Sequence, residues 1–367
     1  MKKEELLARL ALLELEGLGS VGAHALLSKF GSAEAVFNAK MHQILSVYRI
    51  GKKVADNIRN PVSAFKKAEK EVQFIEREAI EVIHLDDYHY PYKLAQCPDA
   101  PFILFSKGRV PTEKQRTVGI VGTRNISKYG KELVEELTDS LKNTGVWVVS
   151  GLAAGIDGEA HRSACLHGLP TLGVMGTGMN MIYPYVHRGL AEEMLERGGG
   201  IISEFPSGTK PDRENFPRRN RIVAGMVDAL VVVEAGEKGG ALITAELAAG
   251  YHREVFAYPG RVGDEFSAGC NRLIQQGKAV MVQSGNDMIS WMQWMGTPKN
   301  ETLWNQNHTW GPLESMLLQC LNDVSSLHID ELVYRSGLGL YEVKAGLLNL
   351  EMENGVKSYP GGRWGKG

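Results

Sequence analysis

The hydrophobic positions between residues 115 and 295 form short apolar runs that alternate with amphipathic stretches. The runs are rich in Val and Ile and nearly continuous, which is typical of strands buried on both faces of a parallel sheet. We expect strands at Thr117–Val121, Val146–Ser150, Thr171–Met175, Gly200–Ser203, Ala229–Val233, Glu254–Ala257 and Ala279–Val282. We expect helices at Lys131–Lys142, Gly158–His167, Gly189–Arg197, Arg221–Met226, Ala241–Tyr251 and Asn271–Gln276. This alternation predicts a doubly wound α/β fold with a mostly parallel sheet, whose ligands bind outside the carboxyl ends of the strands.

The first 60 residues carry only helical patterns. Glycine-containing breaks at Gly17–Gly22 and Tyr48–Lys53 precede predicted helices at Ala23–Phe30 and Val54–Ile58. Such breaks resemble helix-hairpin-helix units, which hold nucleic-acid backbone without reading its sequence. Glycines of this kind also simply cap short helices. The sequence leaves both interpretations open and slightly favours the caps.

The end of the chain predicts a third folded part. Three helical patterns, Leu313–Leu321, Ile329–Ser336 and Tyr341–Glu353, precede a polar ending. Three helices and a short hairpin form the outline of a winged helix. Because the third predicted helix carries a single basic residue, Lys344, a protein contact or a vestigial role is favoured over reading of the DNA major groove.

Charge and cysteine content narrow the class of protein. The 41 Lys and Arg residues are balanced by 43 Asp and Glu residues, which excludes a uniformly basic coat but not a local basic patch. Four scattered cysteines argue against a disulfide framework and a structural zinc site, and no metal site is expected. Neither a signal peptide nor an apolar run long enough to span a membrane is visible. We therefore expect a cytoplasmic protein without membrane contacts.

Glycine-rich loops follow several of the predicted strands. Gly122, Thr123 and Arg124 follow the first strand, while Ser150 and Gly151 end the second. Backbone N–H groups, hydroxyls and a guanidinium at a helix start favour an anion such as phosphate. Tight βα units also need glycine in their turns. Several such loops on one sheet edge nevertheless favour a shared binding site.

Two further loops lie at the same predicted edge. The loop after the fifth strand contains Lys238 and Gly240. The segment 210–221, after the fourth strand, surrounds one aromatic residue and two amides with five cations. Its candidate residues are Lys210, Arg213, Phe216, Arg218, Arg219, Asn220 and Arg221. Guanidinium groups suit phosphates, and an aromatic ring offers a base a surface to stack on. A solvated cluster, in which Asp212 and Glu214 pair with the arginines, leaves Phe216 unexplained.

Common motifs of nucleotide-binding and hydrolytic enzymes are missing. The chain has no GxxxxGK[ST], HExxH or GxSxG motif, and Gly176-Thr-Gly178 lacks the third glycine of a dinucleotide-binding turn. This argues against a P-loop ATPase, an NAD enzyme and a zincin. Cys270 has no base near it in the sequence, and we interpret it as structural.

Residues 80–290 resemble the DNA-processing protein DprA (Smf) family. The matching motifs are Val121-Gly-Thr-Arg124, Ser150-Gly-Leu-Ala-Ala-Gly-Ile-Asp157 with His161, Tyr183-Pro184, Ile202-Ser-Glu204, Phe216-Pro-Arg-Arg-Asn-Arg221 and Gly269-Cys-Asn-Arg-Leu-Ile274. The sequence departs from the family at His187, where Asn is usual, and in the loop Glu237–Gly240. The flanking parts also match, since the family often has a helical N-terminal domain and a winged-helix C-terminal domain.

The resemblance implies a homodimeric protein without cofactor or catalytic activity. It implies that the chain binds single-stranded DNA, protects incoming DNA and loads the RecA recombinase on it during natural transformation. The implied backbone contacts come from Gly122, Arg124, Ser150, Gly151, Arg213, Arg219 and Asn220, while Phe216 stacks on a base. Lys210, Arg218, Arg221, Lys238 and Gly240 line the same site.

Four parts of the chain follow from these observations. They are a helical domain (1–65), an extended Rossmann-like DNA-binding domain (66–295), a linker (296–311) and a winged-helix-like domain (312–367).

An enzyme is the alternative interpretation. Gly239 and Gly240 with Glu246 loosely resemble the loop of nucleoside-monophosphate phosphoribohydrolases on a similar sheet. There a carboxylate stabilises an oxocarbenium-like centre while arginines hold the phosphate.

Overall fold

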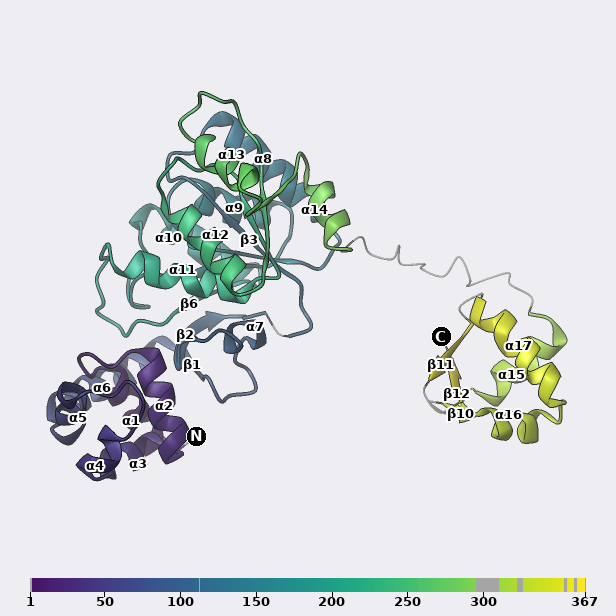
Figure 1. Ribbon diagram of the computed structural model, residues 1–367, viewed down its shortest axis with the longest axis horizontal. Coiled ribbons are helices and arrows are strands. Elements are labelled where there is room, and N and C mark those ends of the chain that lie inside the picture. The colour runs from purple at the N-terminus through teal and green to yellow at the C-terminus, as the bar shows by residue number, and fades with distance from the viewer. Residues whose placement is uncertain are drawn as a thin grey trace. The chain divides into compact units, whose positions relative to one another are not determined.

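The computed structural model describes residues 2–111, 113–294, 310–321, 326–352, 355–359 and 362–366 (Figure 1). The chain divides into two compact units, Met1–Met295 and Gly296–Gly367. No helix in the described ranges is long and apolar enough to cross a membrane. The predicted linker at 296–311 lies outside the described residues, apart from its last two positions.

A nine-stranded sheet forms the centre of the first unit, as far as the described residues extend, in the order β1-β2-β6-β5-β4-β3-β7-β8-β9. The strands are β1 (Glu81–His84), β2 (Ile103–Gly108), β3 (Thr117–Val121), β4 (Trp147–Ser150), β5 (Thr171–Val174), β6 (Gly200–Ser203), β7 (Ala229–Val232), β8 (Glu254–Ala257) and β9 (Val280–Met281). Neighbouring strands from β6 to β9 are parallel, whereas β1 and β2 are antiparallel to each other and β2 is antiparallel to β6.

The doubly wound, mostly parallel fold predicted from the sequence is confirmed. Each of the seven predicted strands is present, with ends that differ by at most one residue. The strands β1 and β2 were not predicted. Their antiparallel pairing extends the sheet beyond β6, where no βαβ alternation marks them in the sequence.

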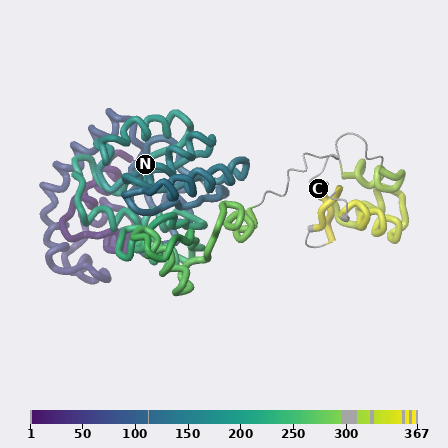
Figure 2. The backbone as a smooth tube through the Cα atoms, turned by 90° about the horizontal axis from the view of Figure 1, so that it is seen from above, coloured from purple at the N-terminus to yellow at the C-terminus, as the bar shows by residue number. Residues whose placement is uncertain are grey.

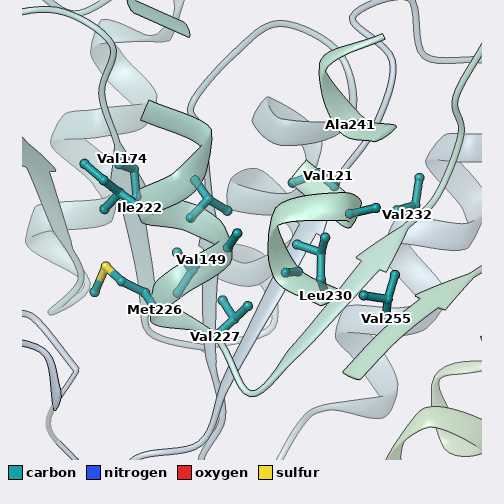
Figure 3. Close-up of a cluster of buried hydrophobic side chains, with 14 of the residues drawn as sticks. Val121, Val149, Val174, Ile222, Met226, Val227, Leu230, Val232, Ala241 and Val255 are labelled. Atoms are coloured by element: carbon teal, nitrogen blue, oxygen red, sulfur yellow. The ribbon is translucent and has the colours of Figure 1, made fainter. Parts of the chain in front are cut away.

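Helices cover both faces of this sheet. One face packs against α7 (Tyr92–Ala95), α11 (Asn215–Met226), α12 (Gly240–Gly250) and α13 (Ala268–Gln275), with buried Leu230 and Val232 pointing to it (Figure 3). The other face packs against α8 (Lys128–Ser140), α9 (Ile156–Leu166) and α14 (Gly285–Trp291). The helix α10 (Arg188–Glu196) covers a smaller cluster near β5 and β6. Each fully buried Val or Leu contributes about 1.5–3 kcal/mol to folding, so this double-sided core holds the strand ends in place.

The strand order reverses direction at β3. Strands β4, β5 and β6 follow it on one side, and β7, β8 and β9 on the other. The carboxyl ends of β3 and β7 therefore form the topological switch point, where open α/β sheets bind their ligands.

Six helices form the N-terminal region. They are α1 (Lys3–Leu13), α2 (Ser20–Phe30), α3 (Ala33–Asn38), α4 (Met41–Leu45), α5 (Lys52–Arg59) and α6 (Val62–Glu78). Gly19 and Gly51 are the N-caps of α2 and α5. Their core includes Phe102, Ile103 and Phe105, around β2, so these helices pack on the sheet in one compact unit. The expected boundary at residue 65 falls inside α6.

The second unit contains α15 (Pro312–Cys320), α16 (Ile329–Ser336), α17 (Leu340–Met352) and three short strands. Those strands, β10 (Leu327–His328), β11 (Val356–Tyr359) and β12 (Arg363–Lys366), pair in the order β10-β12-β11 within the described residues. Figure 2 shows this unit in yellow tones after the grey segment. The helices and the terminal hairpin have the arrangement predicted for a winged helix.

Candidate functional site

A cleft of about 1570 Å³ opens at the switch point. It is bordered by the loops that follow β3, β6, β7 and β8. Most of the candidate residues line it together: Gly122, Thr123, Arg124, Arg213, Phe216, Arg219, Asn220, Lys238 and Gly240. Five others do not: Ser150, Gly151, Lys210, Arg218 and Arg221.

The turn after β3 is held by two neighbouring elements. The Thr123 N–H donates to the Glu234 carbonyl oxygen (2.8 Å), while the Thr123 carbonyl accepts from the Ile156 N–H (3.1 Å). A Cβ on Gly122 would lie 2.5 Å from Ile156 and 2.8 Å from the Glu234 oxygen, so only glycine fits there. This packing fixes the start of the loop and leaves the Arg124 side chain exposed to the cleft.

Phe216 lines the cleft and contacts two other side chains that line it. The Arg124 guanidinium carbon lies over its ring, 4.9 Å from the centroid. The Tyr183 ring packs beside it, with centroids 5.8 Å apart and planes inclined by 41°. A cation over an aromatic ring is attracted by the ring quadrupole, so these three side chains form one ordered cluster.

Helix α11 begins six residues earlier than predicted. It starts at Asn215 instead of Arg221, so Phe216, Arg218 and Arg219 belong to its first turns. Pro217 did not prevent this because the first turn of a helix needs no N–H partner for proline. Helical spacing therefore sends successive cations of this segment in different directions.

Arg219 points into the protein and is only 3% exposed. Its guanidinium donates to the carbonyl oxygens of Gly151 and Val174, immediately beyond β4 and at the end of β5. Burial raises the pKa of the neighbouring Asp157 carboxyl, and the Arg219 charge opposes that rise. The guanidinium expected to contact phosphate is thus engaged in joining two strand ends.

The polar groups of Ser150 and Gly151 are also engaged within the protein. The Ser150 hydroxyl is fully buried and donates to the Ile120 carbonyl oxygen (2.6 Å). The Gly151 N–H donates to Asp157 Oδ2 (3.1 Å). Both residues are candidates for contacts with DNA backbone. In this structure the Ser150 hydroxyl bonds to β3, and the Gly151 N–H stabilises the loop between β4 and α9.

The remaining candidate cations of the segment 210–221 also differ in exposure. Arg221 forms an ion pair with Glu204, and both side chains are largely buried. Arg218 is exposed and lies over the Phe205 ring (5.2 Å), while Lys210 is exposed on the preceding loop. Three of the expected cations are exposed and also line the cleft, namely Arg124, Arg213 and Lys238.

The segment before Lys210 is braced by the N-terminal region. Glu71 on α6 is 5% exposed and accepts hydrogen bonds from the Ser207 N–H (2.9 and 3.0 Å) and its hydroxyl. Burial raises the pKa of the Glu71 carboxyl, and the bonds from Ser207 oppose that rise. The N-terminal helices therefore help to position the loop that leads into the basic segment.

The cleft also contains groups that the sequence interpretation left out. Tyr183 and the exposed Arg261 line it, as do carboxylates at Asp157, Asp212, Glu237, Asp264 and Glu265. Arg261 directly follows Gly260 in the loop after β8. Its position beyond the end of a predicted strand could have identified it as a site residue from the sequence. The cleft lining thus contains both cations and carboxylates, so the cleft is not uniformly positive.

The carboxylate required by the enzyme alternative lies elsewhere. Glu246 is exposed on α12, pairs with Lys278 (3.2 Å) and does not line the cleft. Cys270 is buried, and burial raises the pKa of its thiol to about 12, which keeps it protonated. Neither group supplies a reactive centre at this site.

Comparison with known proteins identifies the family. The family model for DNA recombination-mediator protein A matches residues 81–293, and the model for the DprA winged helix domain matches residues 306–362. Protein Smf of Escherichia coli is 34% identical over 81% of this chain and 80% of its own length. The DNA processing protein DprA of Streptococcus pneumoniae is 42% identical over 56% of this chain and 72% of its own length.

Solved structures agree with this assignment. An X-ray structure of DprA from Streptococcus pneumoniae matches with a TM-score of 0.65 and 31% identity, covering 77% of this chain and 97% of that one. The DNA processing protein A of Helicobacter pylori, described for its single-stranded DNA binding mode, matches with a TM-score of 0.52 and 27% identity, covering 58% and 95%. The resemblance seen in the sequence is thereby confirmed, and the chain belongs to the DNA-processing protein DprA (Smf) family.

Proposed function

We propose that the cleft binds single-stranded DNA. The observation that carries this proposal is the cluster of Arg124 over Phe216, next to the glycine turn at Gly122. A guanidinium and loop N–H groups suit phosphate, and an aromatic ring suits any exposed base. The related protein of Helicobacter pylori, described as binding single-stranded DNA, supports the same ligand class.

The Arg124–Phe216 contact suggests how the strand enters. In the structure the Arg124 guanidinium covers a face of the Phe216 ring. On binding, the guanidinium exchanges the ring for a phosphate, and the vacated face takes a base. The exchange keeps both groups partnered in both states, because a charge-assisted hydrogen bond replaces a cation–π contact.

We further propose that this protein protects incoming DNA and loads RecA on it during natural transformation, as a homodimer and in the cytoplasm. Family membership supports this role. RecA filament growth on DNA coated with single-strand-binding protein should accelerate when the protein is added. Light scattering at micromolar concentration should give twice the chain mass.

A titration with matched oligonucleotides tests the binding proposal. Single-stranded DNA should bind more tightly than duplex and with little sequence preference, because stacking needs an exposed base and phosphate contacts ignore sequence. Affinity should fall linearly with the logarithm of salt concentration. Equal affinity for both forms at moderate salt would contradict the proposal. Release of free base from nucleoside monophosphates would instead favour the phosphoribohydrolase-like alternative.

A further inference from the structure

Next to the cleft, a short segment exposes several large apolar side chains. Met181 is 37% exposed, Tyr183 45%, Tyr185 75% and Val186 79%. We propose that these four residues, here called the aromatic ledge, bind further bases of the single strand as it leaves the cleft. This inference rests on the proposed function, because the ledge would continue the same DNA path.

Tyr183 joins the ledge to the cleft. It lines the cleft, and its ring contacts Phe216 with centroids 5.8 Å apart. Neighbouring aromatic rings in direct contact have centroid separations of about 4.5–7 Å, so no base fits between these two rings. A base following the one at Phe216 would therefore lie on the outer, exposed surface of Tyr183, and the next would reach Tyr185.

Hydrogen bonds at both ends hold the aromatic ledge in place. His187 is 3% exposed, and its Nδ1 bonds to the Leu152 carbonyl oxygen (2.9 Å), in the loop after β4. The Met181 carbonyl accepts a hydrogen bond from the Thr177 hydroxyl (2.8 Å). One end of the segment is thus fixed to the loop after β4 and the other is ordered within the loop after β5, which lowers the entropic cost of presenting its aromatic side chains to a ligand.

The charges around the ledge favour a nucleic acid as its occupant. Arg162 and Arg188, half or more exposed, lie beside it. Arg162 contacts His187 (3.4 Å), and the Arg188 guanidinium interacts with the Tyr185 side chain. Each arginine also pairs with a carboxylate on its own helix, Glu159 or Glu192. Aromatic surfaces with guanidinium groups at their edge are what a single strand requires, with bases inward and phosphates outward.

A length series of labelled oligothymidylates tests this inference. Tyr183→Ala and Tyr185→Ala should each weaken binding of long oligonucleotides, by about 5- to 150-fold per lost stacking contact. The shortest oligonucleotides that still bind should be unaffected by Tyr185→Ala, because they do not reach this residue. Tyr183→Phe and Tyr185→Phe should bind like the parent, since the ring and not the hydroxyl carries the contact.

Matched controls isolate the contribution of the aromatic ledge. Tyr88, 96% exposed in the loop after β1, provides the variant Tyr88→Ala, which should leave binding unchanged. Replacing the outlying nucleotides by abasic sites should abolish the difference between Tyr185→Ala and the parent. Thermal melting of each variant checks folding, and the exposed position of Tyr185 makes its substitution harmless to the core.

The outcomes distinguish this inference from the proposed function. If Phe216→Ala weakens binding while both Tyr→Ala variants bind long oligonucleotides like the parent, the ledge is not part of the DNA path. If Tyr185→Ala changes only the mass measured by light scattering, the ledge is a contact between copies of this chain, and the inference is overturned. If the parent does not bind single-stranded DNA at all, the proposed function itself fails.

Discussion

Two groups of side chains in and just before helix α11 are alike in the sequence and serve different purposes. In the buried group, Arg219 joins the ends of two strands and Arg221 pairs with Glu204. In the accessible group, Phe216 lines the cleft, Arg218 is exposed, and Arg213 precedes the helix in the cleft lining. A cluster of cations in a sequence therefore overstates the number of cations available to a ligand, since helical spacing buries some of them.

The difference has an energetic cause. A guanidinium that is buried away from water needs hydrogen-bond or ionic partners. Substituting a buried arginine therefore lowers the free energy of unfolding, because its partners are left unpaired in the interior. An exposed arginine costs little to remove, because water replaces its contacts. The buried and the exposed arginines should consequently respond to substitution in different measurements.

The largest expected effect is on stability. Arg219→Ala should lower the free energy of unfolding by about 3–5 kcal/mol, because it leaves two buried carbonyl oxygens without their donor and removes the charge that opposes the burial of Asp157. Urea denaturation measures this loss. The matched control, Arg213→Ala, removes an exposed cation of the same segment and should leave the midpoint unchanged. Normal stability of Arg219→Ala together with lost DNA binding would show that this arginine contacts the ligand directly.

The next effect is on affinity. Phe216→Ala should weaken binding of single-stranded DNA by about 1–3 kcal/mol through loss of a stacking surface. The slope of the logarithm of affinity against that of salt should stay the same, since no charge is lost. Phe216→Tyr, which keeps the ring, should bind nearly as the parent does. A changed slope in Phe216→Ala would mean that the ring acts mainly by holding Arg124 in place.

The smallest effect distinguishes the exposed cations from one another. Arg124→Ala and Arg213→Ala should each reduce the salt slope by about 0.7, as expected for one lost phosphate contact on a single strand. Arg218→Ala should leave the slope unchanged, because Arg218 lies over Phe205 and outside the cleft lining. Slopes equal to the parent's for Arg124→Ala and Arg213→Ala would remove both residues from the phosphate path.

The sequence by itself determined the doubly wound sheet and the winged helix. Alternating apolar runs and helical periodicity are local properties, so the strands Thr117–Val121 and Gly200–Ser203 were predicted with their observed ends. Because parallel strands bind ligands at their carboxyl ends, the order of strands and loops along the chain also placed Arg124, Phe216 and Lys238 at one edge.

Only the tertiary structure decided which candidate polar groups are engaged within the protein and which are exposed at the cleft. Ser150, Gly151 and Arg219 belong to the same edge, yet their polar groups bond to Ile120, Asp157 and the carbonyls of Gly151 and Val174. These partners are brought together by the pairing of β3, β4 and β5, which local sequence does not express. Likewise, β2 and the brace from Glu71 to Ser207 depend on segments far apart in the chain. Buried polar groups need hydrogen-bond partners, and these partners often come from distant segments of the chain. Long-range packing therefore decides which polar residues are structural and which face a ligand.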